Sequence, residues 1–358
     1  MNINHPQQQP NHLVERILIM HDSFQKILNR LEQCFQYADG ATEPMCVAVL
    51  GESRTGKSRV IEEFCNRHKD VRTPEGIFRP VVRLRTPAKP TVKGMAELML
   101  TAMGERYDLG GTEQKKTAQI KRLLRSCGTR AVVIEEFNHL VDTASGKVAF
   151  HATDWLKEIA DARNIMLCVS GLESCRKAIS LNEQLAGRFS KPMILPRFDW
   201  RSDADRREFK SIIGAFEAAL KHEYHMPAFT SDSMAFRIFC ATGGIIGYVS
   251  KLLREVVLAA VRDNRSIVTL EDLAEADKVA SWDASLFERG FNPFDRDFPI
   301  SEKDQENDAL LHQVAQIGTR KVENSLGASS TSWSGTKKAH NSGRSGIDLR
   351  GVLSAKGA

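Results

Sequence analysis

The sequence lacks any long apolar run. Of its 358 residues 42% are hydrophobic, yet no stretch approaches the roughly 18 apolar residues that a membrane-spanning helix needs. Its first residues, MNINHPQQQPNH, have neither the basic start nor the apolar block of a secretory signal. These absences argue against a membrane protein, and we expect a cytoplasmic protein with no membrane partner.

Cysteine is sparse, and no two cysteines form a CxxC pair. Several of the seven lie in apolar segments, which is typical of small core residues in a reducing compartment and argues against disulfides and cysteine-bound metals. The seven positions are Cys34, Cys46, Cys65, Cys127, Cys168, Cys175 and Cys240.

Aromatic residues make up only 7% of the chain and charged residues 27%, as in a mixed α/β protein. The net charge of +5 permits an anionic partner without requiring one. We find no internal repeat. The length is sufficient for one large domain and a smaller one.

Between residues 41 and 200, apolar stretches of strand length alternate with stretches of helical periodicity. Strands are expected at 46–51, 77–87, 131–137, 165–172 and 192–198. Helices are expected at 57–68, 91–104, 113–127 and 148–163. Such alternation predicts crossover connections and therefore an α/β domain with a mostly parallel sheet.

The flanking regions differ from this core domain. Residues 1–40 form an expected N-terminal helical extension, with a loose segment to about residue 12 and one or two helices within 13–38. Residues 201–300 show only helical periodicity and predict a separate helical domain. Its helix-start signals are Ser231 or Asp232, and Thr269 followed by Asp272. Residues 301–358 are expected to form a flexible, basic, Ser/Gly-rich tail.

The segment GESRTGKS, residues 51–58, has the spacing G-x-x-x-x-G-K-[ST] between an expected strand and an expected helix. Glycines allow a tight turn whose backbone N–H groups surround a polyphosphate, and the helix start adds its positive dipole end. Lys57 is predicted to reach the β and γ phosphates and Ser58 to bind Mg²⁺. The predicted ATP-binding residues are Gly51, Glu52, Ser53, Arg54, Thr55, Gly56, Lys57, Ser58 and Arg59.

Two adjacent carboxylates, Glu135 and Glu136, end the apolar stretch AVVIEEF. Residues at the carboxyl end of a parallel strand face the ligand crevice. We assign Glu135 to the Mg²⁺ shell and Glu136 to the water that attacks the γ-phosphate.

Two further positions complete the predicted catalytic set. Ser170 ends the next expected strand and either lies beside the γ-phosphate or caps the following helix. Arg188 precedes the last expected strand; it either stabilises the transition state in a neighbouring subunit or is a surface salt-bridge residue.

The order of these elements resembles AAA+ ATPases, and several stretches resemble the TniB/TnsC transposition ATPases. These stretches are VLGESRTGKSRVIEEF, RTPAKPTVKGMAELMLTAMG, VVIEEFNHLVD, VSGLESCRKAISLNEQLAGRF and GGIIGYVSKLLREVV. The RTPAKPT segment and the pair Asn138 and His139 make the resemblance specific. It implies a three-layer αβα sandwich followed by a helical lid domain.

The resemblance also implies a function. Such proteins bind ATP and Mg²⁺, assemble head to tail on double-stranded DNA without sequence preference, recruit a transposase and a target-selection protein of the TniQ type, and disassemble on hydrolysis. It points to the bacterial cytoplasm. Lys89, Lys93 and Lys147 are candidate DNA contacts, with ordinary surface charge as the alternative.

The chain departs from the family pattern in two places. The family usually has Asp-Glu where this chain has Glu135 and Glu136, and its lid arginine has no obvious match, so that Lys251 and Arg254 are only candidates. The first departure keeps open a nucleotide-gated adaptor with negligible hydrolysis. A signalling NTPase of the STAND type is a third alternative.

Overall fold

The computed structural model describes residues 12–105, 111–142, 145–280, 290–299, 307–315 and 317. The segment to residue 11, which forms most of the predicted loose N-terminus, and residues 318–358, which form most of the predicted basic tail, lie outside this set. No helix in the described ranges combines the length and the apolar character that crossing a bilayer requires.

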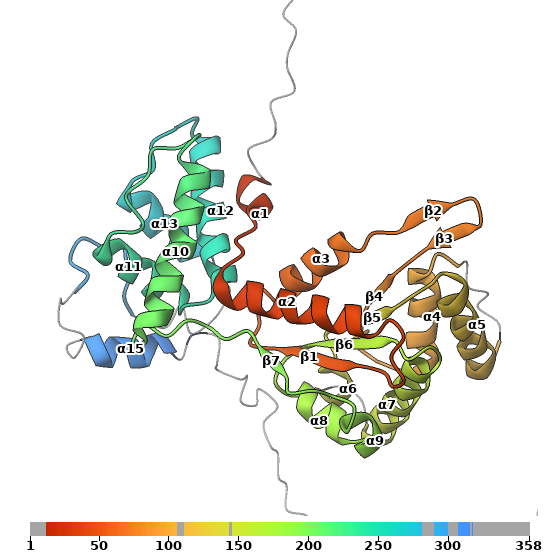
Figure 1. Cartoon of the computed structure of the whole chain (residues 1–358). Coiled ribbons are helices and arrows are strands. Elements are labelled where there is room, and N and C mark those ends of the chain that lie inside the picture. Colours follow the sequence, from red (N-terminus) through yellow and green to blue (C-terminus); the bar gives the residue numbers. More distant parts are fainter. Residues whose placement is uncertain are drawn as a thin grey trace, which may run out of the picture. The chain divides into compact units, whose positions relative to one another are not determined.

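A five-stranded sheet, in which every paired neighbour runs parallel, forms the centre of the fold (Figure 1). Its order is β4-β5-β6-β1-β7. The strands are β1 (Cys46–Leu50), β4 (Val81–Arg85), β5 (Ala131–Glu135), β6 (Met166–Gly171) and β7 (Met193–Ile194). Every residue of β1, β5 and β6 is buried, as expected for parallel strands covered on both faces.

Helices cover both faces of this sheet, and alternate strand residues belong to two different cores. Val47, Val49 and Val133 pack in the core that includes α2 (Asp22–Tyr37) and α3 (Lys57–Arg67). The residues between them pack against helices on the opposite face. These helices are α4 (Val92–Ala102), α5 (Glu113–Ser126), α6 (His139–Asp142), α7 (Gly146–Asp161), α8 (Cys175–Ser180) and α9 (Glu183–Ala186). The predicted three-layer αβα sandwich is confirmed.

The strand predicted at 77–87 is wrong as a single element. Residues Gly76–Phe78 form β3, which pairs antiparallel with β2 (Val71–Thr73) in a separate hairpin, and β4 begins only at Val81. Pro80 stands between them and has no N–H to donate to a ladder. Its carbonyl accepts instead from the N–H groups of Arg130 and Ala131, at 2.9 and 3.0 Å.

A third core lies among helices that follow Trp200. They are α10 (Asp203–Leu220), α11 (Asp232–Thr242), α12 (Ile246–Arg262) and α13 (Leu270–Ala280). Trp200, Phe209 and Phe239 pack in this core in T-shaped and tilted arrangements, with ring centroids 5.2 to 6.5 Å apart. The N-terminal helix α1 (Leu13–Arg16) adds Val14 to it, whereas α2 packs on the sheet. The domain boundary near residue 200 stays a prediction, and the predicted N-terminal extension contributes to two different cores.

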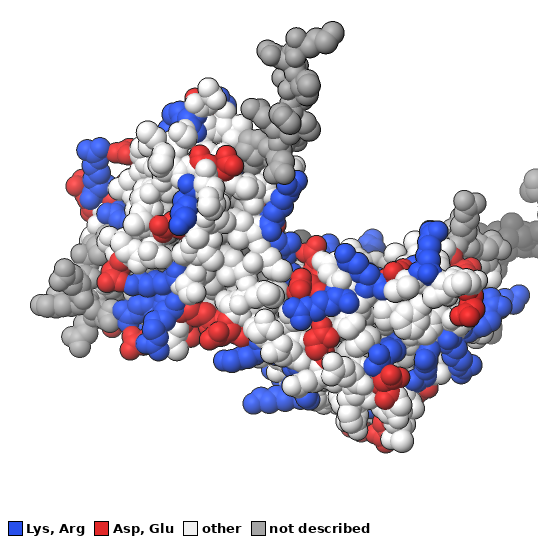
Figure 2. All heavy atoms as spheres, turned by 45° about the horizontal axis from the view of Figure 1, so that its top comes forward, with Lys and Arg blue, Asp and Glu red and all other residues white. Residues whose placement is uncertain are grey.

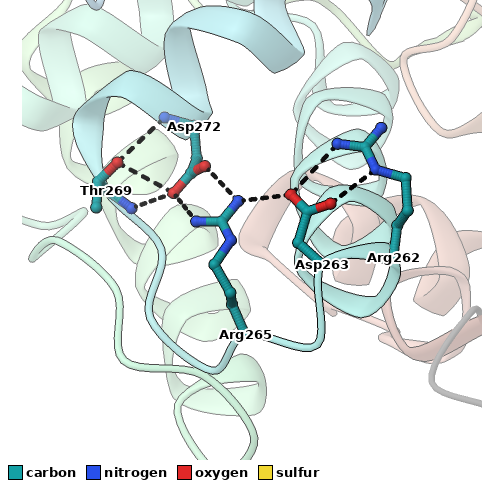
Figure 3. Close-up of polar contacts among 5 residues, drawn as sticks. All are labelled: Arg262, Asp263, Arg265, Thr269 and Asp272. Atoms are coloured by element: carbon teal, nitrogen blue, oxygen red, sulfur yellow. Dashed lines mark hydrogen bonds and ion pairs between the residues drawn. The ribbon is translucent and has the colours of Figure 1, made fainter.

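The turn between α12 and α13 is tied by exposed ion pairs (Figure 3). Arg265 donates to Asp263 at 3.1 Å and to Asp272 at 2.8 Å. Asp272 also accepts from the Thr269 N–H at 2.8 Å, and the Thr269 hydroxyl accepts from the Asp272 N–H at 3.3 Å. This reciprocal cap is the helix start that the sequence predicts.

Five of the seven cysteines are buried, as predicted for core residues, and all seven are free thiols. The buried ones are Cys34, Cys46, Cys168, Cys175 and Cys240. Burial raises the pKa of the Cys46 and Cys175 thiols to about 12. These thiols therefore stay neutral and serve as small apolar side chains.

The predicted tail from residue 301 is wrong in its first part. Residues Asp308–Ala315 form helix α15, and Leu311, Val314 and Ile317 belong to the helical core. A Cβ on Gly243 would lie only 3.0 Å from the Cβ of Ile317, so the glycine allows this close approach. The segment DALLHQVA has the apolar spacing of a short amphipathic helix, but the polar residues that follow it suggest a tail.

Replacing Leu311 with alanine is expected to lower the free energy of unfolding by about 2 kcal/mol, because a buried side chain is truncated. Urea unfolding measures this change. His312→Ala is the matched control: His312 is exposed on the same helix, so it should change stability by less than about 0.5 kcal/mol. Equal effects of the two changes would mean that α15 is no part of the core.

Candidate nucleotide site

The predicted phosphate loop connects β1 to α3, and two of its glycines are needed for its path. A Cβ on Gly51 would lie 2.3 Å from the Leu195 carbonyl oxygen, so only glycine fits there. Gly56 has a φ of 106°, in the left-handed region that favours glycine. The Thr55 hydroxyl donates to the Glu52 carbonyl at 3.0 Å and closes the turn.

Lys57 is the first residue of α3, and its side chain turns back into the loop. Its ammonium donates to the carbonyl oxygens of Gly51, at 2.9 Å, and of Glu52. Burial lowers the pKa of Lys57, and the nearby Glu136 carboxylate is the largest of the charges that oppose this shift. The structure therefore brings together the predicted phosphate-binding lysine and the predicted water-activating carboxylate.

Ser58 and Arg59 follow in the first turn of α3, and they differ in orientation. Ser58 is exposed, which leaves its hydroxyl accessible for the predicted metal role. Arg59 instead donates to the carbonyl oxygens of Glu15, at 2.7 Å, and Ile17, at 3.3 Å. Its guanidinium thus holds the N-terminal segment against α3, and phosphate contact by this side chain stays a prediction.

Glu135 ends β5 and is paired with Arg83 of β4. The Nε and Nη2 atoms of Arg83 both lie 2.7 Å from Glu135 Oε1. The other oxygen, Oε2, is buried and has no hydrogen-bond partner among the described residues. Carboxylate oxygens are ligands that Mg²⁺ and its bound waters prefer. This free oxygen fits the predicted role of Glu135 in the metal shell.

Arg83 is a residue that the sequence analysis missed. The signal was a charged residue in an otherwise buried strand, VVRLR, beside the strand that ends in two acids. Strand alternation places Arg83 and Glu135 on the sheet face covered by α3.

Glu136 adopts a φ of 53°, which is uncommon for a residue with a side chain. Asn138 supports this turn. Its side-chain oxygen accepts from the Leu172 N–H at 3.3 Å, and its amide donates to Asp142 at 2.9 Å. Asn138 therefore links the segment after β5 to the end of β6, which gives Asn138 a physical role.

Ser170 lies near the carboxyl end of β6, opposite Val49 of β1, and is buried. Its carbonyl accepts from the Phe137 N–H at 3.0 Å. The neighbouring Gly171 carbonyl accepts from the Gly51 N–H at 3.2 Å. Ser170 thus lies between the acid pair and the phosphate loop, at the sheet edge that the prediction requires.

Arg188 lies at the opposite ends of the strands from the phosphate loop, beside the first residue of β1. Its carbonyl accepts from the N–H of Cys46, the first residue of β1, at 3.3 Å, whereas the phosphate loop follows the last residue of that strand. Its guanidinium pairs with Asp161 at the end of α7. The structure does not bring Arg188 to the phosphate loop of its own chain.

Helix α12 reaches the phosphate loop through Gly247, another residue that the sequence analysis missed. The Gly247 N–H donates to the Arg54 carbonyl at 3.0 Å, and a Cβ at Gly247 would lie 2.7 Å from two atoms of Arg54. The signal was the glycine in GGIIG, at the start of the helix.

The two candidates for the lid sensor, Lys251 and Arg254, contact residues outside the phosphate loop. Arg254 pairs with Glu255 at 3.3 Å and lies 3.9 Å from Glu15. The Lys251 ammonium lies 5.7 Å from the centre of the Tyr248 ring. Neither residue lines the cavity beside the loop. A lid-sensor role for either stays a prediction.

A mostly apolar cavity adjoins the phosphate loop. Its walls come from the N-terminal segment, the loop and the start of α12. They include Ile17, Leu18, Ile19, His21, Arg54, Thr55, Gly56, Ile246, Gly247 and Ser250. The position and the apolar lining suit a planar organic group attached to a phosphate chain.

The DNA candidates Lys89, Lys93 and Lys147 are exposed. Lys89 follows β4, and Lys93 and Lys147 lie in the first turns of α4 and α7. On the face displayed in Figure 2, basic side chains are interspersed with acidic ones. The charge distribution on this face therefore does not single out a DNA surface.

Replacing Gly247 with alanine is expected to lower both the thermal stability and the ATP affinity, because the added methyl group overlaps Arg54. The overlap should cost about 1–3 kcal/mol, more than the up to 1 kcal/mol that alanine gains in a helix. Differential scanning fluorimetry with and without ATP measures both. Gly146→Ala is the control, since none of the described residues lies within 4 Å of its Cβ position. Identical melting of the two variants would contradict the close contact.

Comparisons with solved structures show the fold. The Aeropyrum pernix ORC2 protein in ADPNP–ADP complexes is 10% identical, with a TM-score of 0.55, over 76% of this chain and 72% of that chain. Cdc6p from Pyrobaculum aerophilum is 12% identical, with a TM-score of 0.58, over 78% and 74%. The Aeropyrum pernix ORC1 protein in complex with DNA is 14% identical, with a TM-score of 0.52, over 75% and 68%.

Among curated protein sequences no relative matches. The family model described as "Bacterial TniB protein" matches residues 11–200, which is more than half of the chain. This match covers the phosphate loop, the acid pair, Ser170 and Arg188. The chain is an AAA+ ATPase that belongs to the bacterial TniB protein family.

Proposed function

We propose that this protein regulates DNA transposition by assembling head to tail on duplex DNA when it holds ATP and by leaving the DNA after hydrolysis. The observation that carries the proposal is the grouping of Lys57, Glu135, Glu136 and Ser170 at one sheet edge, with Arg188 at the other. Such a site needs a second subunit to supply its arginine.

ATP binding is supported by the loop and the cavity together. The backbone N–H groups of residues 51–59 and the Lys57 ammonium would hold the phosphates. The adjoining apolar cavity would take the adenine base. Because α12 forms a wall of this cavity and contacts the loop, the helical domain would sense whether nucleotide is present.

In hydrolysis Glu135 and Glu136 would have different roles. Glu136 would accept a proton from a water molecule as the water oxygen attacks the γ-phosphorus; the bond to the β–γ bridging oxygen breaks, which leaves ADP and inorganic phosphate. Ser170 would orient the same water. Glu135 and Ser58 would hold Mg²⁺, which supplies positive charge to the phosphates when bound.

Arg188 would complete the site of the next subunit. Its guanidinium would leave Asp161 and stabilise negative charge on the transferred phosphoryl group. A contact between two different surfaces of the same protein is heterologous, and it grows into a ring or a helical filament. The shared nucleotide would make this growth dependent on ATP.

DNA would be held through its phosphates by exposed lysines such as Lys89, Lys93 and Lys147. Contacts of this kind release counterions, so binding depends strongly on salt and weakly on sequence. The resemblance to TniB/TnsC proteins adds a transposase and a target-selection protein of the TniQ type as proposed partners.

A nucleotide-gated adaptor with little hydrolysis is the second candidate, and one contact favours it. Arg83 neutralises Glu135, the longer acid in place of the usual aspartate, through two nitrogens at 2.7 Å. This pairing would weaken the hold of Glu135 on the metal shell. Phosphate release in the presence of DNA separates the two candidates.

Mixing two inactive variants tests the shared site. Glu136→Gln removes the proton acceptor and Arg188→Ala removes the arginine, so each alone should lose more than about 90% of DNA-stimulated phosphate release. In an equimolar mixture some interfaces join an intact Glu136 to an intact Arg188 from different subunits. About a quarter of the wild-type rate should return, as random pairing in a head-to-tail assembly implies.

Each variant alone at doubled concentration is the control for this mixture. No recovery in the mixture would refute action of Arg188 in trans. A Glu136→Gln rate equal to that of the wild type would favour the adaptor.

Replacing Lys89 and Lys147 together with alanine should weaken ATP-dependent DNA binding and reduce the slope of log K against log salt by about 2, one unit per lost phosphate contact. Fluorescence anisotropy over a salt titration measures this slope. The matched control is the pair Lys26→Ala and Lys69→Ala, which removes two exposed lysines elsewhere. Parallel slopes for the two double variants would remove Lys89 and Lys147 from the DNA surface.

A further inference from the structure

Arg197, three residues after β7, makes contacts in two directions. On one side its Nε lies 2.9 and 3.0 Å from the two carboxylate oxygens of Glu52, and its Nη2 also donates to Glu52. On the other side Nη1 donates to the Ala315 carbonyl at 3.1 Å and Nη2 to the Ile317 carbonyl at 2.6 Å. One guanidinium thus joins the phosphate loop to the end of α15.

Glu52 puts a negative charge into a loop built for polyphosphate. Its backbone carbonyl accepts from both Thr55 and Lys57, so Glu52 belongs to the turn that sets the shape of the loop. A carboxylate beside bound phosphates raises the free energy of the complex by like-charge repulsion. The loop therefore needs a cation that neutralises Glu52 without occupying the phosphate position.

Arg197 has the properties that this task requires. Its side chain is only 15% exposed, so its charge is less screened by water than a surface charge would be. A planar guanidinium binds a carboxylate through two parallel hydrogen bonds and keeps further N–H groups for other acceptors.

Helix α15 keeps Arg197 in place. The carbonyl groups at the carboxyl end of a helix have no partner within the helix and carry the negative end of its dipole. The Ala315 carbonyl that Arg197 binds belongs to the last residue of α15, and the Ile317 carbonyl lies two residues beyond it. Because Leu311, Val314 and Ile317 anchor the helix in the helical core, they present these acceptors at a fixed position.

We propose that Arg197 is a positioning residue for nucleotide binding: it neutralises Glu52 so that the phosphate loop accepts a triphosphate, and α15 orients it for this purpose. The inference rests on the proposed ATP binding. It also gives α15 and Ile317 a function in the nucleotide site.

The test is the nucleotide affinity of Arg197→Gln, measured by titration with fluorescent ATP and ADP analogues in the presence of Mg²⁺. The uncompensated carboxylate should weaken ATP binding about tenfold. The affinity for ADP should fall less than the affinity for ATP, because ADP lacks the charge of the γ-phosphate. Rising salt should shrink the defect, since repulsion between partly exposed charges is screened.

Rescue separates charge compensation from structural damage. In the double variant Arg197→Gln/Glu52→Gln the repelling carboxylate is gone, and ATP affinity should return to within about threefold of the wild type. A double variant no better than Arg197→Gln would overturn the inference, as would equal losses for ATP and ADP at all salt concentrations.

Arg201→Gln is the matched control. Arg201 pairs with Asp308 at 3.3 Å, at the other end of α15, so this change loosens the same helix without touching the loop. It should leave nucleotide affinity unchanged; an equal loss would assign the effect to helix docking alone. Wild-type protein that binds no ATP would refute the proposed function itself, whereas tight wild-type binding with an unaffected Arg197→Gln would refute only this inference.

Discussion

The contact between the start of α12 and the phosphate loop is the interaction on which the rest of the site depends. It consists of one hydrogen bond, from the Gly247 N–H to the Arg54 carbonyl, and it exists because Gly247 has no Cβ. Through it a helix from one hydrophobic core touches a loop that belongs to another. The same contact closes one wall of the cavity beside the loop. Any nucleotide held there would meet both parts of the chain.

Charge compensation is the second constraint on this site. Two carboxylates near the loop, Glu52 and Glu135, are each paired with an arginine from a neighbouring segment, Arg197 and Arg83. Glu136 lies close enough to Lys57 to raise its pKa, against the effect of burial. The three acids thus have different environments, and a difference in environment is what allows carboxylates of the same type to take different roles.

Much of this could be predicted from the sequence, because the signals are local. An apolar strand, a helical periodicity or the spacing of GESRTGKS can each be recognised within a window of about twenty residues. The positions of Glu135, Glu136 and Ser170 at one sheet edge follow from parallel strands, and the structure confirms them. The break at Pro80 was also local, and it was missed because the apolar residues on both sides suggest one strand.

The residues that were not predicted form contacts with positions far away in the chain. Arg197 meets Glu52 across 145 positions and Arg83 meets Glu135 across 52. Gly247 meets Arg54 only because two cores pack together. Helix α15 is short, and its apolar residues become buried only when they pack into the helical core, where Ile317 lies against Gly243. Tertiary packing, not local pattern, decides each of these.

The central claim is that ATP holds neighbouring subunits together on duplex DNA. Sedimentation velocity of the purified protein with Mg²⁺ and a long duplex, in the presence of ATP, a non-hydrolysable ATP analogue or ADP, tests it most directly. The account predicts large DNA-bound assemblies with the analogue, shorter-lived ones with ATP and none with ADP. Protein that sediments as a monomer under all three conditions, or that assembles equally well with ADP, would contradict it.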